Sequence, residues 1–423
     1  MTGWLSTLSW QAGTASGSFL TGTLIQGWIK LNNPNYEPQN WQGTLLVFAM
    51  VLVLFVANIW GARSMPIVNN FLLIVHVFGF FAVIIVLWTM APRNSAEKVF
   101  TEFTNSGGWS SMGVSLMVGQ ISAIYGFTCQ YTSVPDVLQI CPLWPLSFSP
   151  VITLLTQGAL LGSDATAHMA EEVKDAGTNV PKAMVSSFVL NGLLGLFFVV
   201  TYLFCLPSVE DALNDPTGFP FLYVFRNAVS VGGVNVLTVV ILLLAIASNI
   251  AFNASTSRQT FAFARDNGLP FPKWIGHVHP KLQIPANAIT LTCTLTMLLS
   301  LINIGSSAAF NAIISLQIVA LMASYCISIS CVLYRRLTNT LPRARWSLGR
   351  LGVPINVLGI AYAAFSFFWC FWPNATPVVA YTFNWAPVIF VGVLVCCMLA
   401  YWVKGRKVYV GPVMQVKGEG ESM

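Results

Sequence analysis

The chain has 423 residues, of which 56% are hydrophobic and only 8% are charged. A soluble domain carries about 25% charged residues, so this composition excludes a globule covered by polar surface in water. The sequence therefore predicts an integral membrane protein. The net charge of +6 then reflects membrane orientation and does not indicate a nucleic-acid partner. Nine cysteines without a CxxC pair predict neither a metal site nor a disulfide framework.

A helix that spans a bilayer needs about 20 mostly apolar residues. The first segment of this kind is rich in small residues, including Gly13, Gly17 and Gly22, which let helix backbones approach closely. It therefore predicts an interior, packed helix. Residues 112–172 are counted as one net crossing. The ten predicted crossings are 4–29, 43–60, 66–90, 112–172, 184–206, 232–256, 284–303, 308–334, 353–373 and 385–403.

Lysine and arginine are concentrated in alternate loops, which sets the orientation of a membrane protein. One set of loops holds 16 of the 20 basic residues, and the other set holds Lys30, Arg93, Lys98 and Arg226. Because basic loops face the cytoplasm, this split predicts a cytoplasmic C-terminus. We expect the plasma membrane rather than the vacuole.

The stretch Gly162–Glu172 gathers four ionisable residues in a chain that is otherwise nearly uncharged. Asp164 and His168 are four apart, so a helix places both on one face, and Glu171 is expected to extend that face. An ionisable cluster at membrane depth is a functional-site hypothesis. His168 with Glu171 is a candidate proton-handling pair. The alternative is that Glu171 and Glu172 form the solvated end of the helix, which we prefer for Glu172.

Residues 257–270 are predicted to continue the preceding crossing as a helix beyond the membrane, ending at Gly268 and Pro270. Arg258 lies just inside the boundary, where pairing with an acidic group would close a vestibule. The equally weighted alternative is a simple anchor at the cytoplasmic face.

Asn249 and Asn253 are four apart on the same predicted helix. They are candidates for an ion path, although hydrogen bonding between helices is the simpler interpretation. His76 stands among apolar residues and is interpreted as a packing histidine rather than a proton relay.

Several short motifs resemble the amino acid–polyamine–organocation permeases, and most closely their fungal GABA/choline branch. They are Trp10–Gly17, Gly162–Glu172, Ser257-Arg258, Ala264-Arg265-Asp266, Leu269-Pro270, Pro280-Lys281 and Ile284–Ala288. The resemblance covers nearly the whole chain except residues 128–161, and the motifs occur in the family's order. It is specific for the family and weak for the substrate.

The resemblance implies an all-α integral membrane protein with the LeuT-like inverted-repeat transporter fold of twelve helices. On that plan this chain begins at the third helix, which leaves about ten transmembrane helices and a truncated fold. Substrate sites in such folds lie where the first and sixth helices are unwound. Gly126 and Phe127, followed by Gly162, Ser163 and Asp164, match the break in the sixth helix and are the predicted substrate-binding residues.

Residues 128–161 depart from the family pattern, because relatives run almost directly from Gly126-Phe127 into Gly162. Four prolines in this segment argue against one regular helix. We expect an atypical insertion that arose from a gene-model error. The predicted organisation is 1–127 and 162–403 as the two parts of the transporter domain, separated by that insertion and followed by a cytoplasmic tail, 404–423.

The predicted function is secondary active transport, with H⁺ as the coupling ion, of amino acids or related amines such as GABA or choline. Asp164 supplies negative charge for an ammonium group. No enzymatic activity, metal, cofactor or obligate protein partner is expected; the expected partners are the solute and the lipid bilayer. The alternatives are a truncated or mis-spliced product without transport activity and a membrane channel, although no repeated ring of charged residues indicates a pore.

Overall fold

The computed structural model describes residues 1–126 and 164–409, apart from residues 63, 103–104, 106, 306, 343, 374–375 and 380–382. Within these residues the regular structure is helical. The long helices are α1 (Thr2–Asn32), α2 (Asn40–Ile59), α3 (Met65–Met90), α5 (Met112–Gly126), α9 (Ala176–Phe204), α12 (Val231–Arg265), α14 (Ala286–Gly305), α15 (Ser307–Leu337), α16 (Gly352–Trp369) and α17 (Ala386–Ala400).

Short elements connect them: α4 (Ala96–Thr101), α8 (Ala165–His168), the 3₁₀ turn η1 (Ala170–Glu172), α10 (Val209–Leu213), α11 (Pro220–Ala228), α13 (Pro272–Ile275), the 3₁₀ turn η2 (Gly349–Leu351), the π-helical turn η3 (Tyr401–Gly405) and α18 (Arg406–Val408). Each predicted crossing corresponds in order to one long helix. The crossing predicted over 112–172 corresponds to α5 followed by α8, with the intervening segment 127–163 outside the described residues.

Eight of the described helices are long and apolar enough to cross a membrane: α2, α3, α9, α12, α14, α15, α16 and α17. The chain is therefore a multi-pass integral membrane protein, and its predicted all-α fold class is confirmed. α1 is long enough but too polar to meet the same criterion, and α5 has only 15 residues. α1 can be more polar than these eight helices because it faces protein, where small and hydroxyl side chains pack well.

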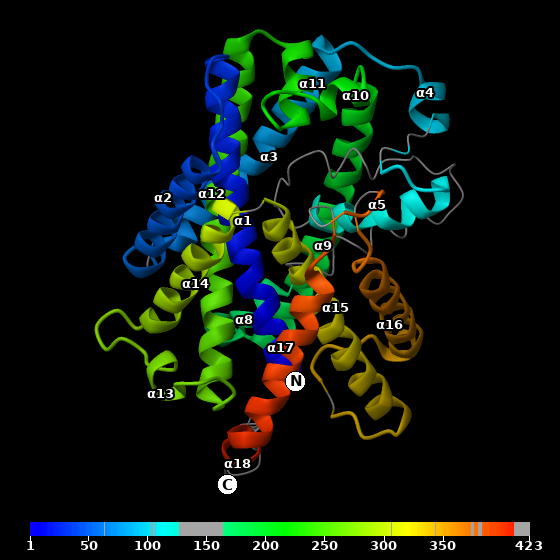
Figure 1. The fold of residues 1–423 in the computed structure, drawn as a ribbon. Coiled ribbons are helices and arrows are strands. Elements are labelled where there is room, and N and C mark those ends of the chain that lie inside the picture. Colours follow the sequence, from blue (N-terminus) through cyan, green and yellow to red (C-terminus); the bar gives the residue numbers. More distant parts are fainter. Residues whose placement is uncertain are drawn as a thin grey trace.

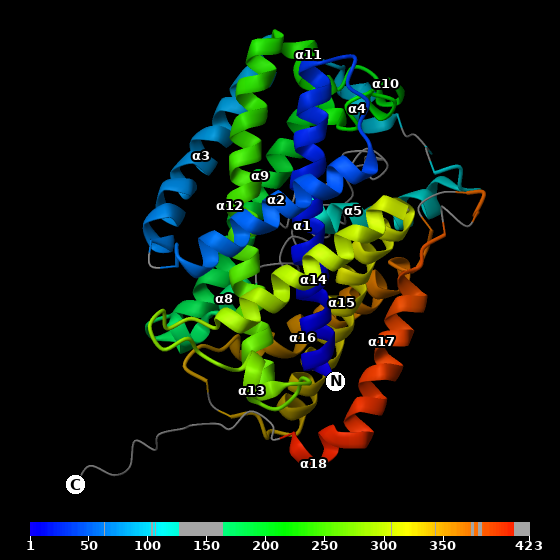
Figure 2. The same cartoon turned by 60° about the vertical axis from the view of Figure 1, so that its left-hand side comes forward.

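α1 lies in the interior of the bundle. It packs against α12, α15, α2 and α14, and Figures 1 and 2 both show it running beside α12. Every residue from Ser9 to Ser18 is buried, and ten consecutive residues cover all sides of a helix. The prediction of an interior, packed helix is confirmed.

The two ends of the bundle differ in charge. One end carries α4, α10 and α11, and the opposite end carries α8, α13 and α18 (Figure 1). Lys30, Arg93, Lys98 and Arg226 lie at the α11 end, whereas Arg265, Lys273, Lys281, Lys404 and Arg406 lie at the α13 end. The alternation predicted from the loops is therefore present in the fold.

A cap made of α10 and α11 covers the α11 end. α11 is an amphipathic helix. Its buried residues are Pro220, Phe221, Leu222, Val224 and Phe225. These residues join a core that includes Leu24 of α1, Leu87 of α3 and Leu237 of α12. Phe219 packs directly on Gly27, where an added Cβ would meet the ring at 2.5 Å. The cap thus links α1, α3 and α12.

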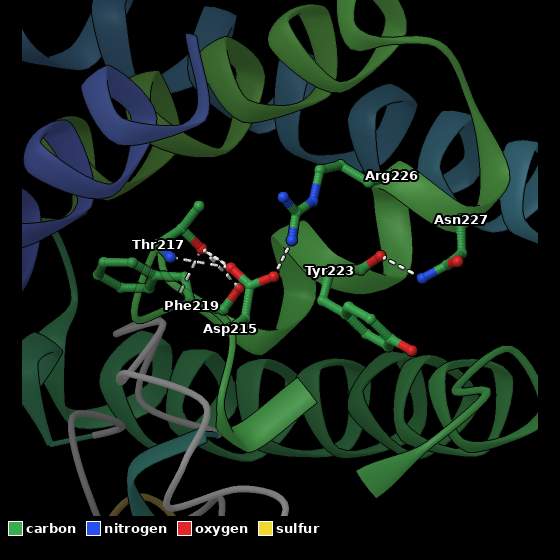
Figure 3. A network of polar contacts seen from close by, with 6 residues as sticks. All are labelled: Asp215, Thr217, Phe219, Tyr223, Arg226 and Asn227. Carbon is green, nitrogen blue, oxygen red and sulfur yellow. Dashed lines mark hydrogen bonds and ion pairs between the residues drawn. The ribbon is translucent and has the colours of Figure 1, made fainter. Parts of the chain in front are cut away.

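A buried carboxylate organises the chain that enters α11 (Figure 3). Asp215 accepts hydrogen bonds from the Thr217 backbone N–H, at 2.9 Å, and from the Thr217 hydroxyl. Its other oxygen pairs with the Arg226 guanidinium, which is partly exposed. A buried carboxylate needs this number of donors, because an uncompensated charge in the interior is destabilising.

We expect Asp215→Ala to destabilise the protein by about 2–4 kcal/mol, because it removes one partner of a largely buried pair and leaves the Thr217 donors unsatisfied. Thermal unfolding of the purified protein in detergent measures this as a lower midpoint. Asn227→Ala on the same helix is the control, since Asn227 is exposed and bonds only the Tyr223 carbonyl oxygen. Equal midpoints for the two variants would contradict the prediction.

Candidate functional site

Asp164 and His168 lie together at the start of the described part of the acidic stretch. Asp164 precedes α8, and the His168 Nε2–Asp164 Oδ2 distance is 3.4 Å. Both side chains are mostly buried, and α8 packs against α12 and α9. The predicted shared face of these two residues is confirmed. The cause is local, since one helical turn brings residues four apart into contact.

Aromatic rings from three other helices surround this pair. Trp10 of α1 meets the His168 ring edge to face at a centroid distance of 4.7 Å. Phe252 of α12 stacks on Trp10 at 4.5 Å, and Tyr325 of α15 interacts with the Asp164 carboxylate. We call these five residues the Asp164 cluster. A carboxylate among aromatic faces is a suitable environment for an organic cation.

Three polar atoms of the Asp164 cluster are buried without a hydrogen-bond partner in the described part of the chain: Asp164 Oδ1, His168 Nε2 and Trp10 Nε1. His168 Nε2 is close enough to Asp164 for an ion pair, but the geometry is not that of a hydrogen bond. Leaving a buried polar atom unsatisfied costs about 1–3 kcal/mol. These atoms therefore give the cluster unused capacity for a polar ligand.

Gly13 makes room for this arrangement. A Cβ built on Gly13 would lie 2.6 Å from the Phe252 ring and 2.7 Å from Gln317 Nε2. Phe252 stacks on Trp10 only because α1 carries no side chain at this position, one turn after Trp10. The glycine-rich pattern of α1 was the sequence signal for close packing, but it did not identify Phe252 as the neighbour.

We expect Gly13→Ala to displace Phe252 from Trp10 and to weaken solute binding. Overpacking typically costs about 1–3 kcal/mol, and a loss of that size in binding corresponds to roughly 5- to 150-fold in affinity. The measurement is binding of a candidate solute to the purified variant. Gly392→Ala is the control, because nothing lies within 4 Å of a Cβ added there. Unchanged affinity in Gly13→Ala would contradict this role for Gly13.

The prediction that Glu171 extends the Asp164–His168 face is wrong. α8 ends at His168, and the chain turns into η1 before Glu171. Glu171 instead forms a bidentate pair with Arg265 of α12, at 2.7 and 3.2 Å. The two members of the predicted proton-handling pair therefore have different partners: His168 contacts Trp10, and Glu171 contacts Arg265.

The Arg265 hydrogen bond holds the pKa of Glu171 below its ordinary value of 4.5. A depressed pKa means that the contribution of the pair is present above the ordinary pKa and is lost only as the pH falls through the lowered value. Glu171 therefore stays ionised at neutral pH. A permanently ionised Glu171 argues against the prediction that this residue carries protons together with His168.

Arg258 pairs with Glu172, one of the two outcomes considered for this arginine. Its Nε and Nη2 donate to the two carboxylate oxygens, the latter at 3.1 Å, and Nη1 donates to the Ala254 carbonyl oxygen. Glu172 is 52% exposed, as expected for a solvated end, and the turn at η1 also directs it towards α12, where it meets Arg258. The signal in the sequence was the seven-residue spacing of Arg258 and Arg265, which places both on one side of α12.

A third ion pair continues this series. Arg345, in the segment between α15 and α16, donates to Asp175 Oδ1 at 2.8 Å. The three acidic residues in 171–175 are thus each paired with a different arginine: Glu171 with Arg265, Glu172 with Arg258, and Asp175 with Arg345. The segment between α8 and α9 is held by these contacts, close to the Asp164 cluster.

Asn249 and Asn253 are both buried on α12. Asn249 donates to the Ser18 hydroxyl of α1 at 3.0 Å, and Asn253 donates to Cys293 Sγ of α14 at 3.8 Å. These contacts support the simpler interpretation of bonds between helices. Both amide oxygens are buried without a partner among the described residues, so a role in an ion path stays a prediction.

Of the remaining predicted substrate residues, Gly126 alone lies among the described residues. Gly126 is the last residue of α5, while Phe127, Gly162, Ser163 and the predicted insertion 128–161 lie outside the described residues. The described ranges hold no group of three His, Cys, Asp or Glu residues that fits a metal ion. Trp10, Phe252, Tyr325 and Glu172 are the functional candidates that sequence reasoning missed.

Comparison with known proteins identifies the family. The family model described as "Amino acid permease" matches residues 1–139 and 140–395. A putative amino acid/polyamine transporter of Macrophomina phaseolina is 28% identical over 89% of this chain and 77% of its own length. The choline transporter of Saccharomyces cerevisiae is 25% identical over 93% of this chain and 64% of its own length. Amino-acid permease 2 of Neurospora crassa is 27% identical over 75% of this chain and 52% of its own length. The matched region therefore spans between about half and three quarters of these relatives.

Proposed function

Because the chain belongs to the amino acid permease family, we propose that it is a secondary transporter of amino acids or related amines that binds the ammonium group of its solute at Asp164. A permease moves its solute unchanged, so the protein is a transporter and not an enzyme. The observation that carries the proposal is the buried Asp164 carboxylate, which interacts with Tyr325 and His168, with Trp10 packed on His168 and Phe252 stacked on Trp10.

Physical chemistry favours an organic cation in this cluster. A carboxylate in a partly dry site attracts an ammonium group more strongly than it does in water. Aromatic faces add about 0.5–2 kcal/mol each for a desolvated cation. Relatives described as amino acid/polyamine and choline transporters handle solutes with such groups, which supports the same solute class here.

Protons are the proposed coupling ion, with His168 as their carrier. His168 touches both Asp164 and Trp10, so a proton on its ring changes the charge beside the solute. Intramembrane histidines and carboxylates form proton relays in transporters. Asn249 and Asn253 of α12 are proposed to line the route of the ion.

Arg258 and Glu172 are proposed as the gate on the cytoplasmic side. Their ion pair joins α12 to the segment that follows α8. Separating the two side chains would remove one of the contacts that hold this segment close to the Asp164 cluster at the α13 end of the bundle. We assign the α13 end to the cytoplasm because it carries the excess of basic residues. Because α18, the last described helix, lies at this end, we propose a cytoplasmic C-terminus, and the plasma membrane is the proposed residence.

Uptake by proteoliposomes that contain the full chain tests the function. We expect saturable uptake of radiolabelled choline, GABA or lysine, stimulated by an inward proton gradient and abolished by a protonophore. Preloaded unlabelled solute is expected to accelerate entry, because a carrier exchanges solute in alternation. Linear uptake without exchange would indicate a channel instead, and a lack of uptake of all three solutes would contradict the proposal.

A further inference from the structure

Trp10 carries a hydrogen-bond donor for which the described structure provides no acceptor. Its side chain is only 2% exposed, and Nε1 has no partner. The indole N–H is a donor and cannot accept, and buried tryptophans usually find an acceptor for it. The rings of Phe252 and His168 account for its apolar contacts but leave this donor unused.

The same cluster holds an unused acceptor. Asp164 is 8% exposed, and its Oδ1 is buried without a hydrogen bond. His168 lies between the two groups: its ring is 4.7 Å from that of Trp10, and its Nε2 is 3.4 Å from Asp164 Oδ2. One neutral donor, from α1, and one anionic acceptor, from the start of α8, therefore belong to residues that both contact His168.

We propose that Trp10 selects the solute: its indole N–H donates to an acceptor oxygen of the solute while Asp164 binds the ammonium group. This inference rests on the proposed transport function. It names the solute class as small molecules that carry both an ammonium group and a carboxylate or hydroxyl oxygen. Alkylammonium ions without such an oxygen leave the buried N–H unsatisfied and bind more weakly.

The same contact explains why a tryptophan suits this position of α1. A phenylalanine would retain the stack on Phe252 and the edge contact with His168, but it offers no donor. A site built to hydrogen-bond a solute oxygen discriminates strongly against an analogue that lacks it, because its own buried group is then unpaired. Trp10 is thus a specificity-determining residue, whereas Phe252 positions its ring.

The test compares two solutes of similar size, GABA and butylammonium, by direct binding to the purified full chain in detergent. The wild-type protein is expected to bind GABA about 10- to 100-fold more tightly, the range expected for a hydrogen bond to a charged group. Trp10→Phe should lower the affinity for GABA by that factor and leave butylammonium unchanged. Asp164→Asn should weaken both.

Trp28→Phe is the matched control. Trp28 is on the same helix, but its N–H already bonds Asn235 Oδ1 at 2.7 Å at the other end of the bundle, so solute selectivity should not change. Thermal midpoints of both tryptophan variants show whether each remains folded, and the ratio of the two affinities is insensitive to the amount of active protein.

Other outcomes overturn the inference in distinguishable ways. If GABA binds and is taken up but Trp10→Phe keeps the wild-type selectivity, the N–H does not contact the solute and only this inference fails. Equal wild-type affinity for GABA and butylammonium has the same meaning. If the wild-type protein binds and transports neither these solutes nor choline or lysine, the proposed function fails and the inference with it.

Discussion

Asp164→Asn is expected to raise the KM for ammonium-bearing solutes at least about 100-fold, with little change in stability. The substitution keeps the size of the side chain and removes its negative charge. Two unit charges 4 Å apart attract by about 4 kcal/mol at the effective dielectric constant near a protein surface, and more where water is excluded. The measurement is initial-rate uptake by proteoliposomes across a range of solute concentrations.

Asp175→Asn is the control for Asp164→Asn. Asp175 belongs to the same stretch of chain, but it pairs with the exposed Arg345 and not with the aromatic rings. We expect near wild-type kinetics for this variant. Asp164→Glu keeps the charge on a longer side chain and should retain part of the uptake. A wild-type KM in Asp164→Asn would remove Asp164 from the solute site.

Charge reversal of the Arg258–Glu172 pair is expected to inhibit uptake in each single variant and to restore much of it in the double variant. Arg258→Glu and Glu172→Arg each place two like charges together, which we expect to reduce uptake roughly 10-fold or more, since close charge pairs in contact couple by about 0.5–3 kcal/mol. The double variant re-forms the pair with the charges exchanged. Uptake by all three variants completes a double-mutant cycle.

The Arg265–Glu171 pair provides the comparison within the same structure. Its side chains are 50% and 66% exposed, whereas Arg258 is 17% and Glu172 52% exposed, so the two pairs differ mainly at the arginine. Exposed ion pairs are worth about 0–1 kcal/mol, so reversing Arg265 and Glu171 should have a small effect. If the Arg258–Glu172 variants showed no more coupling than this exposed pair, the pair would be an anchor and not a gate.

The local features of the candidate site could be predicted because they depend on neighbours in sequence. Asp164 and His168 meet because a single turn of α8 joins them, and the spacing of Arg258 and Arg265 reflects the repeat of α12. Glu171 could not be placed correctly, because α8 stops after one turn and η1 rotates the following residues towards α12. The break is decided by packing against α12 and α9, which spacing alone does not encode.

Membrane residence, the course of the helices and the loops that carry the excess of basic residues could all be predicted from the sequence. Those properties follow from composition and from the length of apolar segments. The tertiary structure was needed to find that Trp10, Phe252 and Tyr325 form one cluster with Asp164 and His168, that Glu172 is the partner of Arg258, and that Asp215 pairs with Arg226. Such contacts join helices that are distant in the chain, and close packing fixes them through the shapes of all the helices together.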